Sequence, residues 1–164
     1  MNNMNKRITF GFLFALLCLL SASITQAVIV ELPLEELVKE ADLIVVGTVE
    51  NVESEFIQGK IFSFATISVK SRIKGELQAQ QNRIVVKFPG GKIGDIGMKI
   101  EDSPDYKKDK EVIVFLKSVQ GESHFTTVGA CRGKFTIGEG IVLRENLPLG
   151  QFLARIEDIM KAAP

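Results

Sequence analysis

Hydrophobic and polar residues alternate with a period of two along most of the chain beyond residue 42, which is the pattern of β-strands. The stretch 61–73 shows this alternation most clearly. One of its faces carries apolar side chains, namely Ile61, Ala65, Ile67, Val69 and Ile73. The opposite face carries Thr66, Ser68, Lys70 and Arg72. The alternation predicts a half-buried antiparallel strand whose apolar face points into the core.

Turn signals divide the chain into six or seven predicted strands. Their ranges are 43–52, 61–73, 84–88, 111–116, 124–129, 134–137 and 141–145. The turn at 58–60 joins the first two into a long hairpin, and the turn at 138–140 joins the last two. Because 111–116 is apolar at nearly every position, we expect a central strand there, covered on both faces. Residues 89–110 lack sustained periodicity and predict a long loop with room for a short strand.

A helix is predicted on either side of these strands. Pro33 favours a helix start, and apolar residues follow at helical spacing, at Leu34, Leu37, Val38 and Ala41. After Pro148, a second amphipathic helix carries one apolar face, formed by Leu149, Phe152, Leu153, Ile156, Ile159 and Met160. Short strands with hairpin turns and two flanking helices predict a mainly β protein, a small antiparallel OB-like barrel of about six strands with the C-terminal helix packed on it.

Residues 1–27 have the pattern of a secretory signal peptide. Lys6 and Arg7 precede an apolar run at 8–20, and the small residues 21–23 follow it. About 13 apolar residues fall short of the roughly 18 to 20 that span a bilayer as a helix. We expect cleavage between Ala27 and Val28, with a cut after Ser23 as the alternative. The expected product is a single exported domain, residues 28–164, located in the periplasm or secreted, with no membrane span.

The composition of residues 28–164 limits the classes of partner. Loss of Lys6 and Arg7 leaves 18 of the 20 basic residues against 20 acidic ones, a formal charge near −2. Nucleic acids and anionic membranes favour a basic face, so we expect neither as a partner. Cys18 leaves with the signal, so no internal disulfide can form. Cys131 is then either a small buried hydrophobic residue or a thiol that pairs with another chain.

The sequence holds few residues of the kinds that catalyse reactions. His124 is the only histidine, and without a nucleophile motif around it we expect a solvent-facing strand or turn residue. One histidine and one cysteine are too few for a zinc site, so we expect no metal or other cofactor. Four acidic residues cluster in the second half of the long loop, at Glu101, Asp102, Asp105 and Asp109. We expect these side chains to be solvated, as charged loop residues usually are. The alternatives are that two of them catalyse glycoside hydrolysis, or that their oxygens bind calcium.

Aromatic residues provide the candidate binding site. Phe62 and Phe64 fall on the otherwise polar face of the strand 61–73, where their rings are exposed unless a helix or the long loop covers them. Exposed aromatic rings bind sugars, peptides and proteins at low entropic cost. Tyr106, followed by Lys107 and Lys108 in the long loop, is a second candidate at the rim of this surface.

Several segments carry a resemblance to known proteins: 41–49, 73–75, 88–91, 114–116 and 129–135. They resemble a group of uncharacterised bacterial secreted proteins over most of residues 28–164. The beginning of the expected exported domain is also distantly similar to tissue-inhibitor-of-metalloprotease and netrin-like modules. In those modules a short segment is followed by a strand that contains Gly-x-Val. This resemblance implies an exported OB-like barrel. Those animal modules depend on several disulfides, which this chain cannot form internally.

We therefore expect a non-catalytic exported module that binds a protein or glycan of the cell envelope or extracellular space. The first alternative, from the resemblance, is an inhibitor of a secreted protease whose segment from Val28 enters the catalytic cleft. A hydrolase acting on glycans is the second alternative.

Overall fold

The computed structural model describes residues 32–77 and 82–162. The predicted signal peptide and its cleavage site at Ala27 and Val28 lie outside these residues. The described elements, in chain order, are α2 (Leu34–Glu40), β1 (Leu43–Ile57), β2 (Lys60–Lys74), β3 (Arg83–Pro89), β4 (Gly91–Ile93), β5 (Ile96–Met98), β6 (Glu111–Ser118), β7 (Phe125–Thr127), the 3₁₀ helix η1 (Ala130–Gly133), β8 (Lys134–Gly138), β9 (Ile141–Val142), β10 (Leu147–Pro148) and α3 (Leu149–Ala162).

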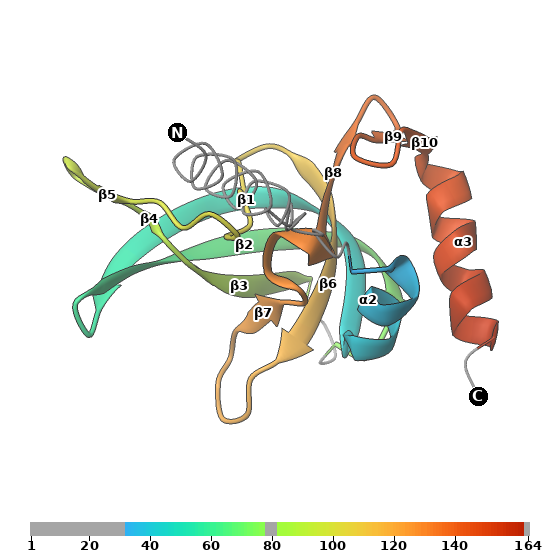
Figure 1. Ribbon diagram of the computed structural model, residues 1–164, viewed down its shortest axis with the longest axis horizontal. Helices are drawn as coiled ribbons and strands as arrows, with labels where there is room; N and C mark the ends of the chain where they lie inside the picture. The colour runs from blue at the N-terminus through green and yellow to red at the C-terminus, as the bar shows by residue number, and fades with distance from the viewer. Residues whose placement is uncertain (1–31, 78–81, 163–164) are drawn as a thin grey trace, which may run out of the picture. The chain divides into compact units, whose positions relative to one another are not determined.

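Five strands close into a barrel. Strands β1, β2, β3, β7 and β6 are hydrogen-bonded in that order, and β6 also pairs with β1, which completes the ring (Figure 1). Within the ring, β3 and β7 are parallel and the other neighbours are antiparallel. The predicted fold, a mainly β OB-like barrel with a helix near each end, is confirmed, and the parallel pairing of β3 with β7 is an exception to the antiparallel arrangement that was expected. The central position predicted for 111–116 is confirmed too, because β6 pairs with β1 on one edge and with β7 and β8 on the other.

One hydrophobic core fills the inside of the barrel. It is formed by Leu43, Val45, Val49, Ala65, Ile67, Ile84, Val86, Phe88, Tyr106, Val112, Val114 and Leu116. Ala65 and Ile67 come from the face of β2 that the sequence predicts to be buried, and Val69 packs against them. Ile73 was expected on the same face but packs against the second core. The register between β1 and β2 shifts twice in the part of β2 that follows Val69, so the alternation of faces is interrupted there.

A second core lies between the outside of the barrel and the two helices. It includes Ile44, Val46, Ile113 and Phe115 from β1 and β6, which alternate with residues of the first core. From α2 it receives Leu37 and Val38, and from α3 Phe152 and Ile156 (Figure 1). The apolar faces predicted for both helices therefore pack against this core, and the residues at their centres are buried. Within the part of the chain that the structure describes, no helix has the length and apolarity to cross a bilayer.

The region predicted as a long loop contains a small hairpin. Strands β4 and β5 pair with each other as a separate sheet, so the expectation of a loop with one short strand is incomplete. Gly91 opens β4 so close to β1 and β2 that an added Cβ would meet the hydroxyls of Ser54 and Ser63. Ser63 is buried and donates a 2.7 Å hydrogen bond to the carbonyl of Gly90, which holds this end of the hairpin on the barrel.

Two predicted strands near the C-terminus are shorter than expected. Residues 143–146 form turns, so the predicted strand 141–145 is limited to β9, which β10 then pairs. The strand expected at 124–129 is limited to β7, which leaves His124 in the preceding loop.

Candidate functional site

An aromatic surface lies on the outside of the barrel, on β2 and β3. The register places Phe64 beside Lys87 of β3, and Phe62 beside Pro89. The Nζ atom of Lys87 lies 4.8 Å from the ring centroid of Phe62 and 5.8 Å from that of Phe64. Both rings are half-buried. We use the name aromatic surface for Phe62, Phe64, Lys87 and His124.

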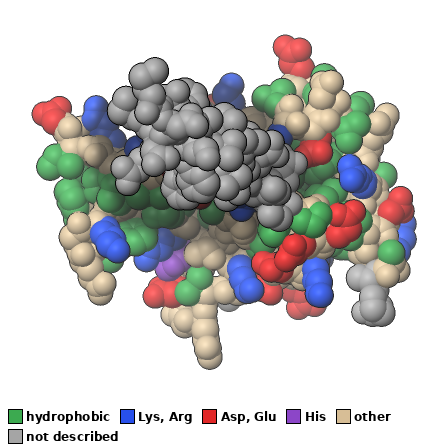
Figure 2. Space-filling view, viewed as in Figure 1, with side chains coloured by type: hydrophobic (Ala, Val, Ile, Leu, Met, Phe, Trp, Pro, Cys, Tyr) green, Lys and Arg blue, Asp and Glu red, His purple; other side chains and the backbone are tan. Residues whose placement is uncertain are grey.

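His124 closes one side of this surface. Its ring meets that of Phe64 edge-on, with centroids 6.0 Å apart, and its Nδ1 lies 3.6 Å from a carboxylate oxygen of Glu122. The side chain is 12% exposed, so the expectation of a solvent-facing histidine is wrong. Figure 2 shows the histidine (purple) on a face that also carries hydrophobic and basic side chains.

The β1 neighbours of the two phenylalanines are acidic. Glu55 is opposite Phe62 and Glu53 is opposite Phe64 in the β1–β2 pairing. Both glutamates are exposed. The aromatic rings therefore lie between a row of carboxylates on β1 and the ammonium group of Lys87 on β3.

Tyr106 does not belong to this surface. Its side chain is 5% exposed in the barrel core, where its ring centroid lies 5.1 Å from that of Phe88. Its hydroxyl shares a 2.8 Å hydrogen bond with the hydroxyl of Thr127. The prediction of an exposed rim residue is therefore wrong, because the chain before β6 turns this ring inward. Burial raises the pKa of Tyr106 well above its ordinary value, and the hydrogen bond with Thr127 offsets only part of this shift.

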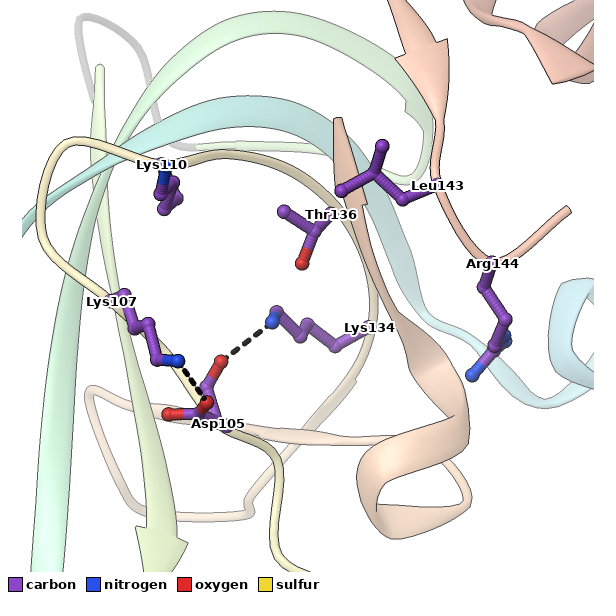
Figure 3. A pocket seen from close by; sticks show the side chains of 7 residues that line it. All are labelled: Asp105, Lys107, Lys110, Lys134, Thr136, Leu143 and Arg144. Carbon is purple, nitrogen blue, oxygen red and sulfur yellow. Dashed lines mark hydrogen bonds and ion pairs between the residues drawn. The ribbon is translucent and has the colours of Figure 1, made fainter. Parts of the chain in front are cut away.

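Lys107 and Lys108 are exposed, as the sequence predicts, but they belong to a different part of the molecule from Phe62 and Phe64. Lys107 forms an ion pair of 3.1 Å with Asp105 and lines a pocket of about 360 Å³. We call this the basic pocket; its lining residues are Asp105, Lys107, Lys110, Lys134, Thr136, Leu143 and Arg144 (Figure 3). Lys110, Lys134 and Arg144 were not predicted from the sequence, since they come from three separate segments.

The remaining candidates have structural contacts. Of the loop carboxylates, Asp105 is paired with Lys107, and the backbone carbonyl of Asp102 accepts a 2.9 Å hydrogen bond from the amide of Cys131. Cys131 lies in η1 and is half-buried. Residues 32–77 and 82–162 hold no group of three or more His, Cys, Asp or Glu side chains arranged to bind a metal ion.

Comparison with protein-family models and with curated proteins found no match to this chain. The resemblance to bacterial secreted proteins and to metalloprotease-inhibitor modules therefore stays a prediction from the sequence.

Proposed function

We propose that this chain is an exported, non-catalytic binding module that recognises its ligand with the aromatic surface. The observation that carries the proposal is the position of Phe62 and Phe64 on the outer face of β2. The barrel has a complete core without these rings, because Ala65 and Ile67 fill the inner side of the same strand. Two half-buried aromatic side chains on the outer face of a strand, beyond what the core needs, fit a ligand-binding role.

The charges around the rings favour a protein ligand over a sugar. Stacking of a sugar needs a free ring face, whereas the Lys87 ammonium lies 4.8 Å from the Phe62 centroid. A polypeptide contacts aromatic side chains in many orientations and can pair charges with Lys87 and with Glu53 and Glu55 on the neighbouring strand. Such a partner would be an envelope or extracellular protein, and a glycan remains the alternative ligand.

Export is supported by the charged, apolar and small-residue order of residues 1–27. The non-catalytic assignment is supported by the sequence, in which His124 is the only histidine and has no nucleophile motif around it. The alternative function, inhibition of a secreted protease, depends on the segment that begins at Val28, which lies outside the described residues.

The test is a pull-down from envelope extract with three forms of the purified protein. These are the wild type, the double variant F62A/F64A and the control F56A. Phe56 is 54% exposed near the tip of the β1–β2 hairpin, so F56A removes an exposed aromatic ring from a different place. We expect the wild type and F56A to capture the same protein, and F62A/F64A to lose it. Equal capture by all three forms would contradict the proposal, and capture of a polysaccharide would replace the protein ligand by a glycan.

A further inference from the structure

The basic pocket gathers positive charge from distant parts of the chain. Lys107 and Lys110 come from the segment before β6, Lys134 from the start of β8, and Arg144 from the turn after β9. Asp105 supplies the one carboxylate among the lining residues. Four basic residues and one acidic residue thus line a cavity of about 360 Å³, although residues 28–164 have a formal charge near −2.

Both walls of the basic pocket are fixed to the barrel. On one side, the amide of Val49 donates to the carbonyl of Lys110 at 2.9 Å, and the amide of Asp109 donates to the carbonyl of Val49 at 2.8 Å. On the other side, Lys134 and Thr136 lie on β8, which pairs with β6. Thr136 also accepts, through its carbonyl, a 3.0 Å hydrogen bond from the amide of Leu143. The pocket is therefore formed before any ligand binds.

Two of the four cations that line the basic pocket, Lys110 and Lys134, form no ion pair with the carboxylates of the described residues. The carboxylate of Asp105 forms an ion pair of 3.1 Å with Lys107. Lys134 donates a hydrogen bond of 2.6 Å to the backbone carbonyl of Asp105, which is neutral (Figure 3). The guanidinium of Arg144 lies 3.9 Å from the centroid of the Phe135 ring, donates to the carbonyl of Arg132, and has its Nε 3.8 Å from a carboxylate oxygen of Glu145. Burial lowers the pKa of Lys134; the charges of Lys107 and Arg144 lower it further, and Asp105 opposes them. An anion in the pocket would relieve this repulsion.

We propose that the basic pocket binds the phosphate or sulfate group of a small molecule. Lys110, Lys134 and the hydroxyl of Thr136 face the cavity from different directions, which suits a tetrahedral anion that accepts hydrogen bonds on several oxygens (Figure 3). Leu143 forms an apolar wall beside them and is 58% exposed, so it offers a contact for the organic part of an ester. This site is separate from the aromatic surface and does not depend on the function proposed above.

The experiment is a titration of the ¹⁵N-labelled protein followed by NMR. The probes are inorganic phosphate, inorganic sulfate, glucose 6-phosphate and acetate, all at constant ionic strength so that screening does not change. We expect saturable shifts with the first three probes in the amides of 105–110, 134–136 and 143–144. Tighter binding of glucose 6-phosphate than of phosphate would identify an ester as the ligand class, and equal binding would identify the free ion.

Two variants remove charge from the pocket, and a third is the control. K110Q and K134M each remove one ammonium group, and we expect each to weaken phosphate binding about tenfold or more, equal to about 1.4 kcal/mol. K108Q makes the same change of charge at an exposed neighbour of Lys107 that does not line the pocket, so it should bind phosphate like the wild type. K110Q keeps the test valid if K134M folds poorly, since Lys110 is exposed.

Three results would overturn the proposal. The first is the absence of any saturable shift with phosphate, sulfate or glucose 6-phosphate. The second is binding of acetate as tight as that of phosphate, which would show that the pocket does not select a tetrahedral anion. The third is wild-type affinity for phosphate in both K110Q and K134M.

Discussion

The hydroxyls of Tyr106 and Thr127 are joined by a hydrogen bond of 2.8 Å, which links the segment before β6 to β7 at the edge of the barrel core. Thr127 pairs with Leu116 of β6, and Tyr106 packs on Phe88 of β3. The ring of Tyr106 is therefore part of the core, and it fixes the segment before β6 to the barrel.

Tyr106 should resist ionisation for as long as the protein is folded. It is the only tyrosine of the chain, which has no tryptophan, so the phenolate absorbance reports on this residue alone. Burial raises its pKa above the ordinary value of about 10, so in alkali the unfolded chain loses the proton and the folded chain keeps it. Stability should then fall by up to about 1.4 kcal/mol for each pH unit above 10. We expect phenolate absorbance to appear together with the loss of native circular dichroism; a midpoint near 10 in a folded protein would contradict the burial.

Replacement of Phe62 or Phe64 by Ala should cost less stability than replacement of a core phenylalanine. Both rings are half-buried, so we expect a loss of about 1–2 kcal/mol for each, below the roughly 3–5 kcal/mol of a fully buried ring. F152A is the matched control, because Phe152 is 0% exposed in the second core. Urea unfolding followed by circular dichroism measures all three. Equal losses in F62A and F152A would mean that the aromatic surface belongs to the folding core.

Gly47 should not tolerate alanine. An added Cβ at this position would overlap the carbonyl oxygen of Ser68 and lie 2.6 Å from Cγ2 of Ile67, so β1 and β2 would have to separate. We expect G47A to lose about 1–3 kcal/mol of unfolding free energy, or more if the barrel opens. Gly150 in α3 is the control, since a Cβ added there would meet nothing within 4 Å and alanine favours helix. G150A should be neutral or stabilising, and a G47A variant as stable as G150A would disprove the close approach.

The sequence was sufficient to locate most of the individual strands and both helices, because period-two alternation and turn residues report on each strand separately. The hairpin of β1 and β2, the doubly covered β6 and the apolar faces of α2 and α3 all follow from local patterns. Closure by the β1–β6 and parallel β3–β7 pairings depends on partners far apart in the chain, which no local pattern specifies. The β4–β5 hairpin was missed because three-residue strands are too short to show alternation.

The candidate site was predictable only where strand alternation decides the direction of a side chain. Phe62 and Phe64 lie on the outer face of β2, as the register of that strand requires. Tyr106 lies in a segment without regular structure, so nothing in the sequence indicated that its ring turns into the core. The basic pocket could not be predicted because β8 brings Lys134 next to a loop that ends more than twenty residues earlier.

The proposed export predicts where the N-terminus of the purified protein lies. Processing at the proposed site should give a mature chain that begins at Val28, which N-terminal sequencing or intact mass measures directly. A chain that retains the apolar stretch 8–20 after passage through the secretory pathway would contradict the signal peptide. The same mature protein separates the two candidate functions. Residues added before Val28 should abolish protease inhibition but leave binding through the aromatic surface unchanged.

The binding function is tested most directly by titrating the captured ligand, once purified, into the wild type, F62A/F64A and F56A under identical conditions. Isothermal calorimetry gives the dissociation constant of each. We predict that F62A/F64A, with its fold verified by circular dichroism, binds at least about tenfold more weakly than the wild type. F56A should bind as the wild type does. An unchanged dissociation constant in F62A/F64A would contradict the proposal that this face of β2 and β3 is the binding surface.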